Sequence, residues 1–198
     1  HIRAPRRQSR EGPPYQRQST MFPNEITTER LVLRPPTEAD AEQLFSRYCQ
    51  DREVCRYMSW GPHRSIDDTY DYLRRITSEN DAGTTAGFLI FSRRTNELLG
   101  SVGGRLNATT IQWGYCLARD AWGQGFATEA ARAFACEAIK QPSIWRLQAF
   151  CDLENRASAH VLEKSGSKLE GILRRYMVLP NLGDAPRDMY CYAMVRES

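Results

Sequence analysis

The spacing of hydrophobic and polar residues in the first third of the chain predicts a strand followed by two helices. In "TERLVLRP" apolar and polar positions alternate, which predicts a strand that ends at Pro35 and Pro36. Thr37 and Asp40 then have the spacing of a capping box, and apolar residues at helical spacing follow them. A second helix is predicted to begin at Ser65, because an aspartate stands three residues further on.

The middle of the chain predicts strands that lead into a pair of glycines. "TTAGFLIFSRR" and "ELLGSVGGRL" have strand composition and are joined by a short turn, and "TTIQWGYCLA" is a third strand. Gly123 and Gly125 follow it. One apolar stripe of an amphipathic helix comes next, formed by Phe126, Ala130, Phe134 and Ala138. Pro142 is expected to end this helix.

The last third predicts a strand, a helix and two more strands. "SIWRLQAFCDL" is a strand, and Asn155 is a good N-cap for a helix that ends at Gly166. Strands are expected at about Lys168–Val178 and Arg187–Val195. Strands therefore alternate with helices through most of the chain, which predicts a single α/β domain with a mixed sheet.

Composition indicates a globular domain preceded by a basic arm. The chain has 198 residues, of which 41% are hydrophobic and 26% charged. Residues 1–20 hold five arginines and one acid, so the formal charge of +3 comes from this end. We expect residues 1–20 to be disordered or to precede a natural start at Met21, and residues 21–198 to form the domain. An arm that binds nucleic acid is disfavoured, because no aromatic–basic pattern follows it.

The six cysteines and three histidines predict no metal site and no disulfide framework. Cys116, Cys136 and Cys151 lie in apolar segments, as reduced core cysteines usually do, and are poor candidates for nucleophiles. No apolar run has the length of a membrane span and no signal peptide is visible, so we expect a cytoplasmic protein.

The segment "WGQGFATEAARAF" places two glycines just before a predicted helix. The start of a helix has unpaired N–H groups and a partial positive charge, and glycines let an anion approach them closely. A dinucleotide fingerprint needs a glycine where Thr128 stands, and a Walker loop needs a lysine after Gly125, so neither fits. Two interpretations remain: the amides from Gly123 to Thr128 wrap a pyrophosphate, or the segment is an ordinary tight turn.

Three segments together resemble a known family. "WGYCLARDAWGQGFATEA" followed by "NRASAHVLEKSG" resembles the GNAT acetyltransferases, in the branch of the ribosomal-protein alanine N-acetyltransferases, and "TERLVLRPPTEADAEQLF" does so too. The likeness runs from about Thr28 to Val195. It implies a mixed, mostly antiparallel central sheet with flanking helices and a splay between its two middle strands. It also implies direct transfer of an acetyl group from acetyl-CoA to a primary amine in a ternary complex.

The resemblance further implies which residues bind acetyl-CoA. The family loop falls on Trp122, Gly123, Gln124, Gly125, Phe126 and Ala127, and Thr128 completes the amide cradle. Trp122 stands where the family usually has Gln or Arg. The pantetheine arm would run along Cys116, Leu117 and Ala118 like an added strand, and the N–H of Leu117 would polarise the thioester carbonyl. Asn155 would contact a pantetheine amide, besides capping its helix.

The residues for proton transfer depart from the family pattern. Many members have a tyrosine where Leu162 stands, so Ser158 is our candidate donor to the leaving thiolate, although it can also be only a polar residue on a helix face. Gln112 replaces the usual carboxylate. The base is therefore left open between a water chain, Asp188 and Tyr115.

These departures leave a second hypothesis, a non-catalytic module that binds acyl-CoA. For the enzyme, the acceptor is either a protein N-terminal α-amine or a small-molecule amine, held beside the early helices. Carboxylates there, such as Asp67 and Asp68, would attract a cationic amine or else cap their own helix. We expect no membrane and no nucleic-acid partner, and leave open whether the chain forms a homodimer.

Overall fold

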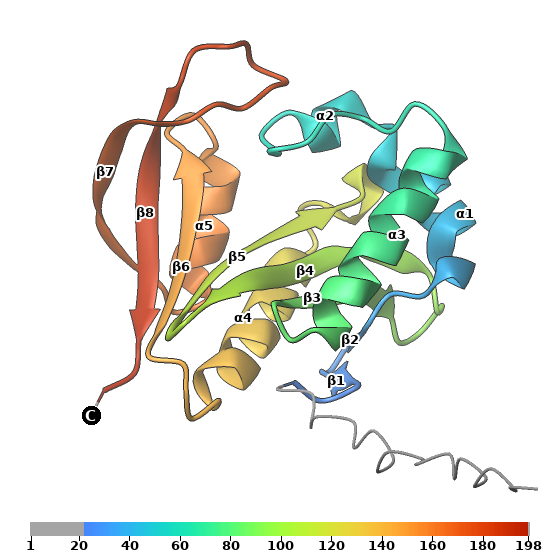
Figure 1. Cartoon of the computed structure of the whole chain (residues 1–198), viewed down its shortest axis with the longest axis horizontal. Helices are drawn as coiled ribbons and strands as arrows, with labels where there is room; N and C mark the ends of the chain where they lie inside the picture. Colours follow the sequence, from blue (N-terminus) through green and yellow to red (C-terminus); the bar gives the residue numbers. More distant parts are fainter. Residues whose placement is uncertain (1–21, 198) are drawn as a thin grey trace, which may run out of the picture.

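The computed structural model describes residues 22–197 and shows one eight-stranded sheet with helices on both faces (Figure 1). The expectations for residues 1–20 lie outside the described residues. The strands follow the spatial order β1-β2-β3-β4-β5-β6-β8-β7. They are β1 (Ile26–Thr27), β2 (Leu31–Arg34), β3 (Thr85–Ser92), β4 (Leu98–Asn107), β5 (Thr110–Leu117), β6 (Arg146–Asp152), β7 (Lys168–Met177) and β8 (Arg187–Val195). All neighbouring strands are antiparallel except β5 and β6, so the predicted mixed, mostly antiparallel sheet is confirmed.

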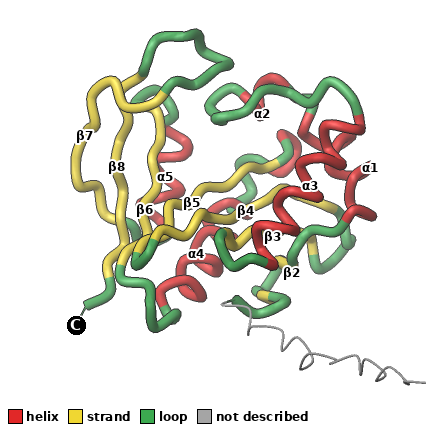
Figure 2. The backbone as a smooth tube through the Cα atoms, in the orientation of Figure 1, coloured by secondary structure: helices red, strands yellow, loops and turns green. Residues whose placement is uncertain are grey.

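The sheet opens in its middle. The parallel strands β5 and β6 pair only from Thr110 opposite Arg146 to Gln112 opposite Gln148. Beyond Gln112 the two strands diverge, and in Figure 2 the strands fan apart at this place. The expected splay between the two middle strands is therefore confirmed, and it leaves one edge of β5 without a neighbouring strand.

Helices α1 and α3 cover one face of the sheet, and α4 and α5 cover the other, while the short α2 contacts η2 (Figure 1). The α-helices are α1 (Ala41–Leu44), α2 (Arg52–Cys55), α3 (Ile66–Asp81), α4 (Phe126–Ile139) and α5 (Arg156–Lys164), with shorter helical turns η1 (Glu38–Asp40), η2 (Phe45–Cys49) and η3 (Arg119–Ala121). The predicted first helix is thus divided, because its first turn is 3₁₀ and its last is π-helical. The sequence patterns did not predict the short β1 and α2.

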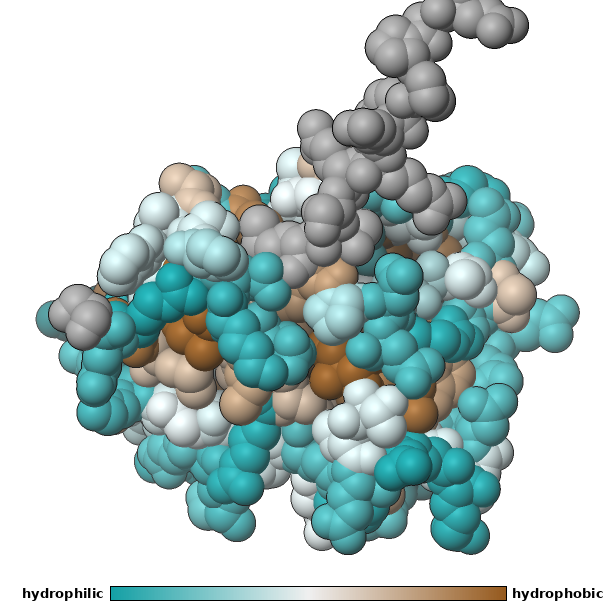
Figure 3. All heavy atoms as spheres, turned by 90° about the horizontal axis from the view of Figure 1, so that it is seen from below, coloured by the Kyte–Doolittle hydropathy of each residue, from teal (hydrophilic) through white to brown (hydrophobic). Residues whose placement is uncertain are grey.

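Three side chains start helices where the sequence predicts them. Capping boxes form between Thr37 and Asp40 and between Ser65 and Asp68, and Asn155 accepts a hydrogen bond from the amide of Ser158. Among residues 22–197, no helix has the length and apolar character needed to cross a membrane. On the face seen in Figure 3, polar side chains dominate and hydrophobic ones lie in patches between them.

The stripe of α4 fills the larger of two hydrophobic cores. Ala130, Phe134 and Ala138 are fully buried, and the ring of Phe134 stacks on Phe22 with 5.6 Å between centroids. Phe134 also lies 5.8 Å from Trp113 of β5, so the core supports the strand that borders the opening. One prediction was wrong: Cys136 is exposed, because it lies on the opposite side of α4 from this stripe.

Replacing Phe134 by alanine is expected to lower the free energy of unfolding by about 3–5 kcal/mol, because it removes a ring from a fully packed site. Urea unfolding followed by far-UV circular dichroism measures the change. Cys136→Ala, on the exposed side of the same helix, should stay within about 0.5 kcal/mol of the parent. Similar losses for both variants would contradict this packing.

Candidate active site

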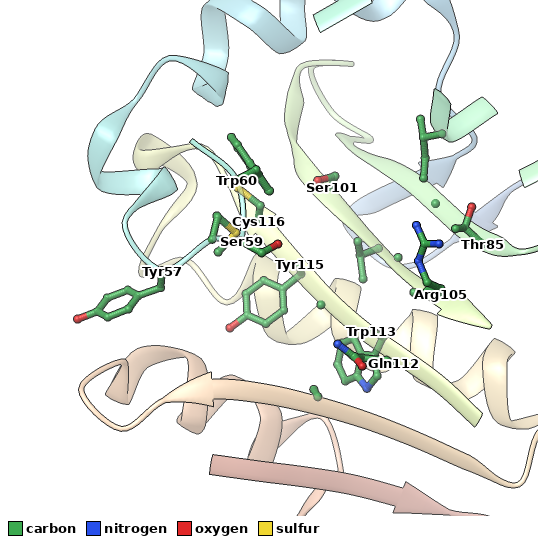
Figure 4. A pocket seen from close by; sticks show the side chains of 18 of the residues that line it. Tyr57, Ser59, Trp60, Thr85, Ser101, Arg105, Gln112, Trp113, Tyr115 and Cys116 are labelled. Carbon is green, nitrogen blue, oxygen red and sulfur yellow. The ribbon is translucent and has the colours of Figure 1, made fainter. Parts of the chain in front are cut away.

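A cavity of about 690 Å³ lies where the sheet opens (Figure 4). Helix α3 and strands β3, β4 and β5 line one part of it, while β6 and the start of α5 line another. Because β5 and β6 diverge here, the cavity connects the two faces of the sheet.

The free edge of β5 presents backbone groups to this opening. The amide of Ala118 donates to the carbonyl of Leu99 on β4 at 2.8 Å. Since successive N–H groups of a strand point to opposite edges, the amides of Leu117 and Tyr115 point away from β4 and into the gap. On the same edge, the indole of Trp122 donates to the carbonyl of Leu117 at 2.9 Å. This edge can pair with an extended ligand as another strand would.

The loop after β5 presents a run of free amides. Gly123 and Gly125 have φ values of +71° and +80°, which turn the chain into α4. None of the hydrogen bonds within residues 22–197 uses the amides from Gly123 to Thr128 as donors, whereas the amide of Glu129 donates to the carbonyl of Gly125 at 3.1 Å. A Cβ on Gly123 would meet nothing within 4 Å, so the backbone conformation, not crowding, requires glycine. The amides together form a cradle that suits a pyrophosphate.

Arg30 and Glu129 hold this loop in place, and sequence reasoning missed both. The guanidinium of Arg30 donates to the Gln124 carbonyl at 2.9 Å and to the Glu129 carboxylate at 2.7 Å, and lies 4.6 Å from the centre of the Phe126 ring. Glu129 also accepts from the hydroxyl of Thr28 at 2.6 Å. The only sequence signal was the acidic residue in the first turn of α4, since its partners are about a hundred positions away.

The carboxylate of Glu129 stays charged because of these contacts. Burial alone would raise its pKa, but the hydrogen bonds from Thr28 and Arg30 outweigh burial and hold the pKa below its ordinary value of 4.5. The negative charge of Glu129 lies in the first turn of α4, where a helix N-terminus favours it. The loop and the segment before β2 are therefore joined by an ionic contact.

Ser158 and Tyr115 meet across the gap between β5 and α5. The hydroxyl of Tyr115 donates to Oγ of Ser158 at 3.3 Å, and Asn155 holds the Ser158 amide at 3.1 Å. Burial raises the pKa of Tyr115 to about 12, so this phenol keeps its proton at neutral pH and is excluded as a base. The structure thus brings together Ser158, Asn155 and the free edge of β5.

The cysteines near the gap are not activated. Burial raises the pKa of Cys151 to about 12 and that of Cys116 well above its ordinary value. Both thiols are therefore protonated at neutral pH, which agrees with their interpretation as core residues. All six cysteines are free thiols. Within residues 22–197, no group of three or more His, Cys, Asp or Glu side chains could hold a metal ion.

The candidate bases differ in position. Gln112 lines the cavity, but an amide cannot take up a proton at neutral pH. Asp188 accepts a hydrogen bond from the amide of Arg175 at 2.8 Å and is not part of the cavity wall. Asp68 forms the capping box of α3, as the simpler interpretation expected. Leu162 is buried in the wall where many family members have a tyrosine.

Sequence reasoning also missed polar groups on the α3 side of the cavity. Tyr48 donates to Ser101 at 3.1 Å, and Nδ1 of His63 lies 2.7 Å from Oγ1 of Thr69. Burial lowers the pKa of His63, so its imidazole is neutral at pH 7. No spacing in the sequence links these residues, because they come from separate elements.

Comparison with known proteins gives concordant matches. A family model described as an acetyltransferase (GNAT) domain matches residues 30–168. An uncharacterized N-acetyltransferase, p20 of Bacillus licheniformis, is 31% identical over 154 residues, which cover 76% of this chain and 86% of the relative.

Two solved structures share the fold. The microcin C7 self-immunity acetyltransferase MccE, in complex with acetyl-CoA and AMP, has a TM-score of 0.80 and 21% identity over 90% of this chain and all of the neighbour. RimL, a ribosomal L7/L12 α-N-protein acetyltransferase in complex with coenzyme A, has a TM-score of 0.78 and 21% identity over 86% of this chain and 97% of that one.

The contact between Arg30 and Glu129 predicts a pH-dependent loss of stability. Glu129→Gln is expected to lower the free energy of unfolding by about 1–2 kcal/mol at pH 7. The pKa of Glu129 is lower in the folded protein than its ordinary value of 4.5. The charged carboxylate therefore stabilises the folded state fully above pH 4.5, and this stabilisation is lost as the pH falls through the folded-state pKa. The difference between variant and parent, measured by urea unfolding, should therefore shrink below about pH 4.

Glu42→Gln is the matched control, because Glu42 is an exposed acid in the first turn of α1. This control should stay within about 0.5 kcal/mol of the parent at each pH. A constant difference for Glu129→Gln from pH 7 to pH 3 would refute the assigned charge state.

Proposed function

The chain belongs to the GNAT acetyltransferase family, and from this membership we propose that it transfers the acetyl group of acetyl-CoA to a primary amine by direct attack in a ternary complex. That it is an acetyl-CoA-dependent N-acetyltransferase follows from the family. The route and the residues are our proposal. One observation carries it: the run of free amides at the start of α4 lies next to the unpaired edge of β5.

In the proposed complex the loop holds the coenzyme through its backbone. The amides from Gly123 to Thr128 bind the pyrophosphate, with no need for a metal or a lysine. The pantetheine arm extends along Cys116, Leu117 and Ala118 and pairs with the free edge of β5. Asn155 contacts a pantetheine amide with the part of its side chain that the cap leaves free. These groups place the thioester in the gap between β5 and β6.

The chemistry then needs an oxyanion donor and a proton for the leaving group. The amine nitrogen attacks the thioester carbonyl carbon, and the oxygen that becomes negative accepts a hydrogen bond from the amide of Leu117. The amide of Tyr115, two residues earlier on the same edge, is the alternative donor. When the carbon–sulfur bond breaks, Ser158 gives its hydroxyl proton to the thiolate and takes up a proton from water, which has accepted the one lost by the amine. The phenol of Tyr115 donates a hydrogen bond to Oγ of Ser158 throughout.

The attacking amine loses its proton to water rather than to a carboxylate. Gln112 stands where the family often has an acid, and Asp188 is held by a backbone amide outside the cavity. An α-amine has a pKa of about 8, so a useful fraction is neutral at pH 7 without an enzymatic base. Rate should therefore rise with pH until the amine is fully neutral.

Gly125→Asp is expected to weaken acetyl-CoA binding by at least about tenfold, because it adds a negative charge beside the proposed pyrophosphate site. Its Cβ would lie 3.4 Å from Nη2 of Arg30, so the new carboxylate would also compete for the guanidinium that holds the loop. Isothermal titration calorimetry measures the dissociation constant. Gly83→Asp is the matched control: Gly83 also has a positive φ, +68°, and open space around it, but it ends α3 away from the loop. Equal affinity for both variants would exclude this loop as the pyrophosphate site.

Ser158→Ala is expected to lower kcat by about a hundredfold, the contribution of a positioned proton donor, with little change in acetyl-CoA affinity. Release of free thiol with an amine panel measures kcat. Tyr115→Phe removes the hydroxyl while keeping the ring, and should lower kcat by less than Ser158→Ala does. Ser46→Ala, at an exposed serine of η2, is the control. An unchanged kcat in Ser158→Ala would remove this residue from the mechanism.

A further inference from the structure

The cavity face of β4 and β5 consists of three cross-strand pairs in a row. Arg105 lies opposite Gln112, Gly103 opposite Gly114, and Ser101 opposite Cys116. Because alternate residues of a strand face the same side, these side chains share one face, and all six residues line the cavity. Figure 4 shows Ser101 and Cys116 toward one end of the two strands and Arg105 and Gln112 toward the other.

The middle pair has no side chains, and its two glycines differ in their surroundings. A Cβ on Gly103 would meet the carbonyl oxygen of Ala86 at 2.6 Å, so the neighbouring strand requires glycine there. A Cβ on Gly114 would meet nothing within 4 Å. Gly114 therefore borders open space in the cavity, and no packing constraint requires its lack of a side chain.

The end of the cavity at Arg105 carries one excess positive charge. Arg105 and Arg75 both contact the carboxylate of Glu79, each at 3.3 Å. Two guanidinium groups thus share one carboxylate, and each keeps further N–H donors. The side chain of Gln112, beside Arg105, makes no hydrogen bond to any residue between 22 and 197. This end suits an anionic group.

Of the other three carboxylates of the cavity wall, two form ion pairs within the described part of the chain. Asp71 pairs with Arg74 at 2.7 Å, and Asp152 pairs with Arg187. Asp68 accepts the amides of Arg64 and Ser65 at 2.7 and 3.2 Å. Among residues 22–197, Asp68 is thus the wall carboxylate without an ion pair, and the two amides hold it at the start of α3. The end of the cavity at Arg105 still offers guanidinium donors to an anion, and the charges of Arg105 and Arg75 would repel a polycation that reached it.

We propose that this cavity takes an acceptor with one primary amine and one anionic group, joined by an unbranched chain. The inference rests on the amine transfer proposed above. The amine lies at the Tyr115 edge of β5, the chain crosses Gly103 and Gly114, and the anion binds Arg105 with Arg75 beside it. Tyr115 and Gln112 are three residues apart on β5, so amine and anion are separated by about 10 Å.

Glycine peptides test this arrangement, because triglycine has its amine and carboxylate at about this separation. We compare triglycine with its C-terminal amide, and with spermidine, by thiol release from acetyl-CoA. Triglycine should exceed its amide about tenfold in kcat/KM, the effect of one charge-assisted hydrogen bond, and spermidine should be the poorest acceptor.

Arg105→Gln should abolish the preference for the carboxylate while leaving the acetyl-CoA dissociation constant unchanged. Arg94→Gln, which removes an equal charge from the exposed turn between β3 and β4, should keep the preference. Gly114→Val should lower kcat/KM for triglycine at least tenfold, whereas Gly171→Val, at an equally open glycine of β7, should not. Thermal melting checks that all four variants fold.

Three results would overturn the inference: equal use of triglycine and its amide, a better rate with spermidine, or the same behaviour of Arg105→Gln and Arg94→Gln. In each of these cases an amine is still acetylated, so the proposed function stands. If the protein binds acetyl-CoA but acetylates none of the amines, both proposals fall together. The two failures are therefore distinguishable.

Discussion

The site depends on one constraint: backbone N–H groups need hydrogen-bond partners, and two adjacent sets of them have none within residues 22–197. One set is the edge of β5 beyond Gln112, where β6 turns away. The other is the run of amides at the start of α4. A ligand with a diphosphate and an extended amide chain satisfies both at once. In the proposed complex, donor recognition therefore relies on the main chain rather than on particular side chains.

Main-chain recognition works only if the main chain is held rigidly, and the surrounding side chains do this. The ring of Phe134 packs α4 against Trp113 of β5 and also stacks on Phe22. Arg30 and Glu129 tie the loop to the segment before β2, and Trp122 ties it back to Leu117. Each of these contacts joins residues of different elements. These contacts fix the conformation of the loop, so its amides stay available to a ligand.

Local patterns predicted most of this fold, and long-range contacts account for what they missed. The stripe of α4, the capping boxes at Thr37 and Ser65 and the Asn155 cap depend on residues within one or two turns, so the sequence is sufficient. The pairing of Arg30 with Glu129, and of Tyr115 with Ser158, requires knowing how the strands are ordered. Cys136 is a different case, because the spacing of the α4 stripe already places it on the opposite side of the helix, and its apolar neighbours in sequence were misleading.

The proposed donor site and the proposed acceptor site therefore recognise their ligands through different kinds of groups. The proposed donor site consists of backbone amides and two glycines, so it suits any thioester of the same coenzyme and says little about the acceptor. The proposed acceptor site uses side chains from α3, β4 and β5. The register of β4 and β5 places Arg105 opposite Gln112, and Arg105 contacts Glu79 of α3. Changing one residue there alters charge or space without touching the coenzyme site. Acceptor choice can consequently diverge among proteins of this fold while donor binding is retained.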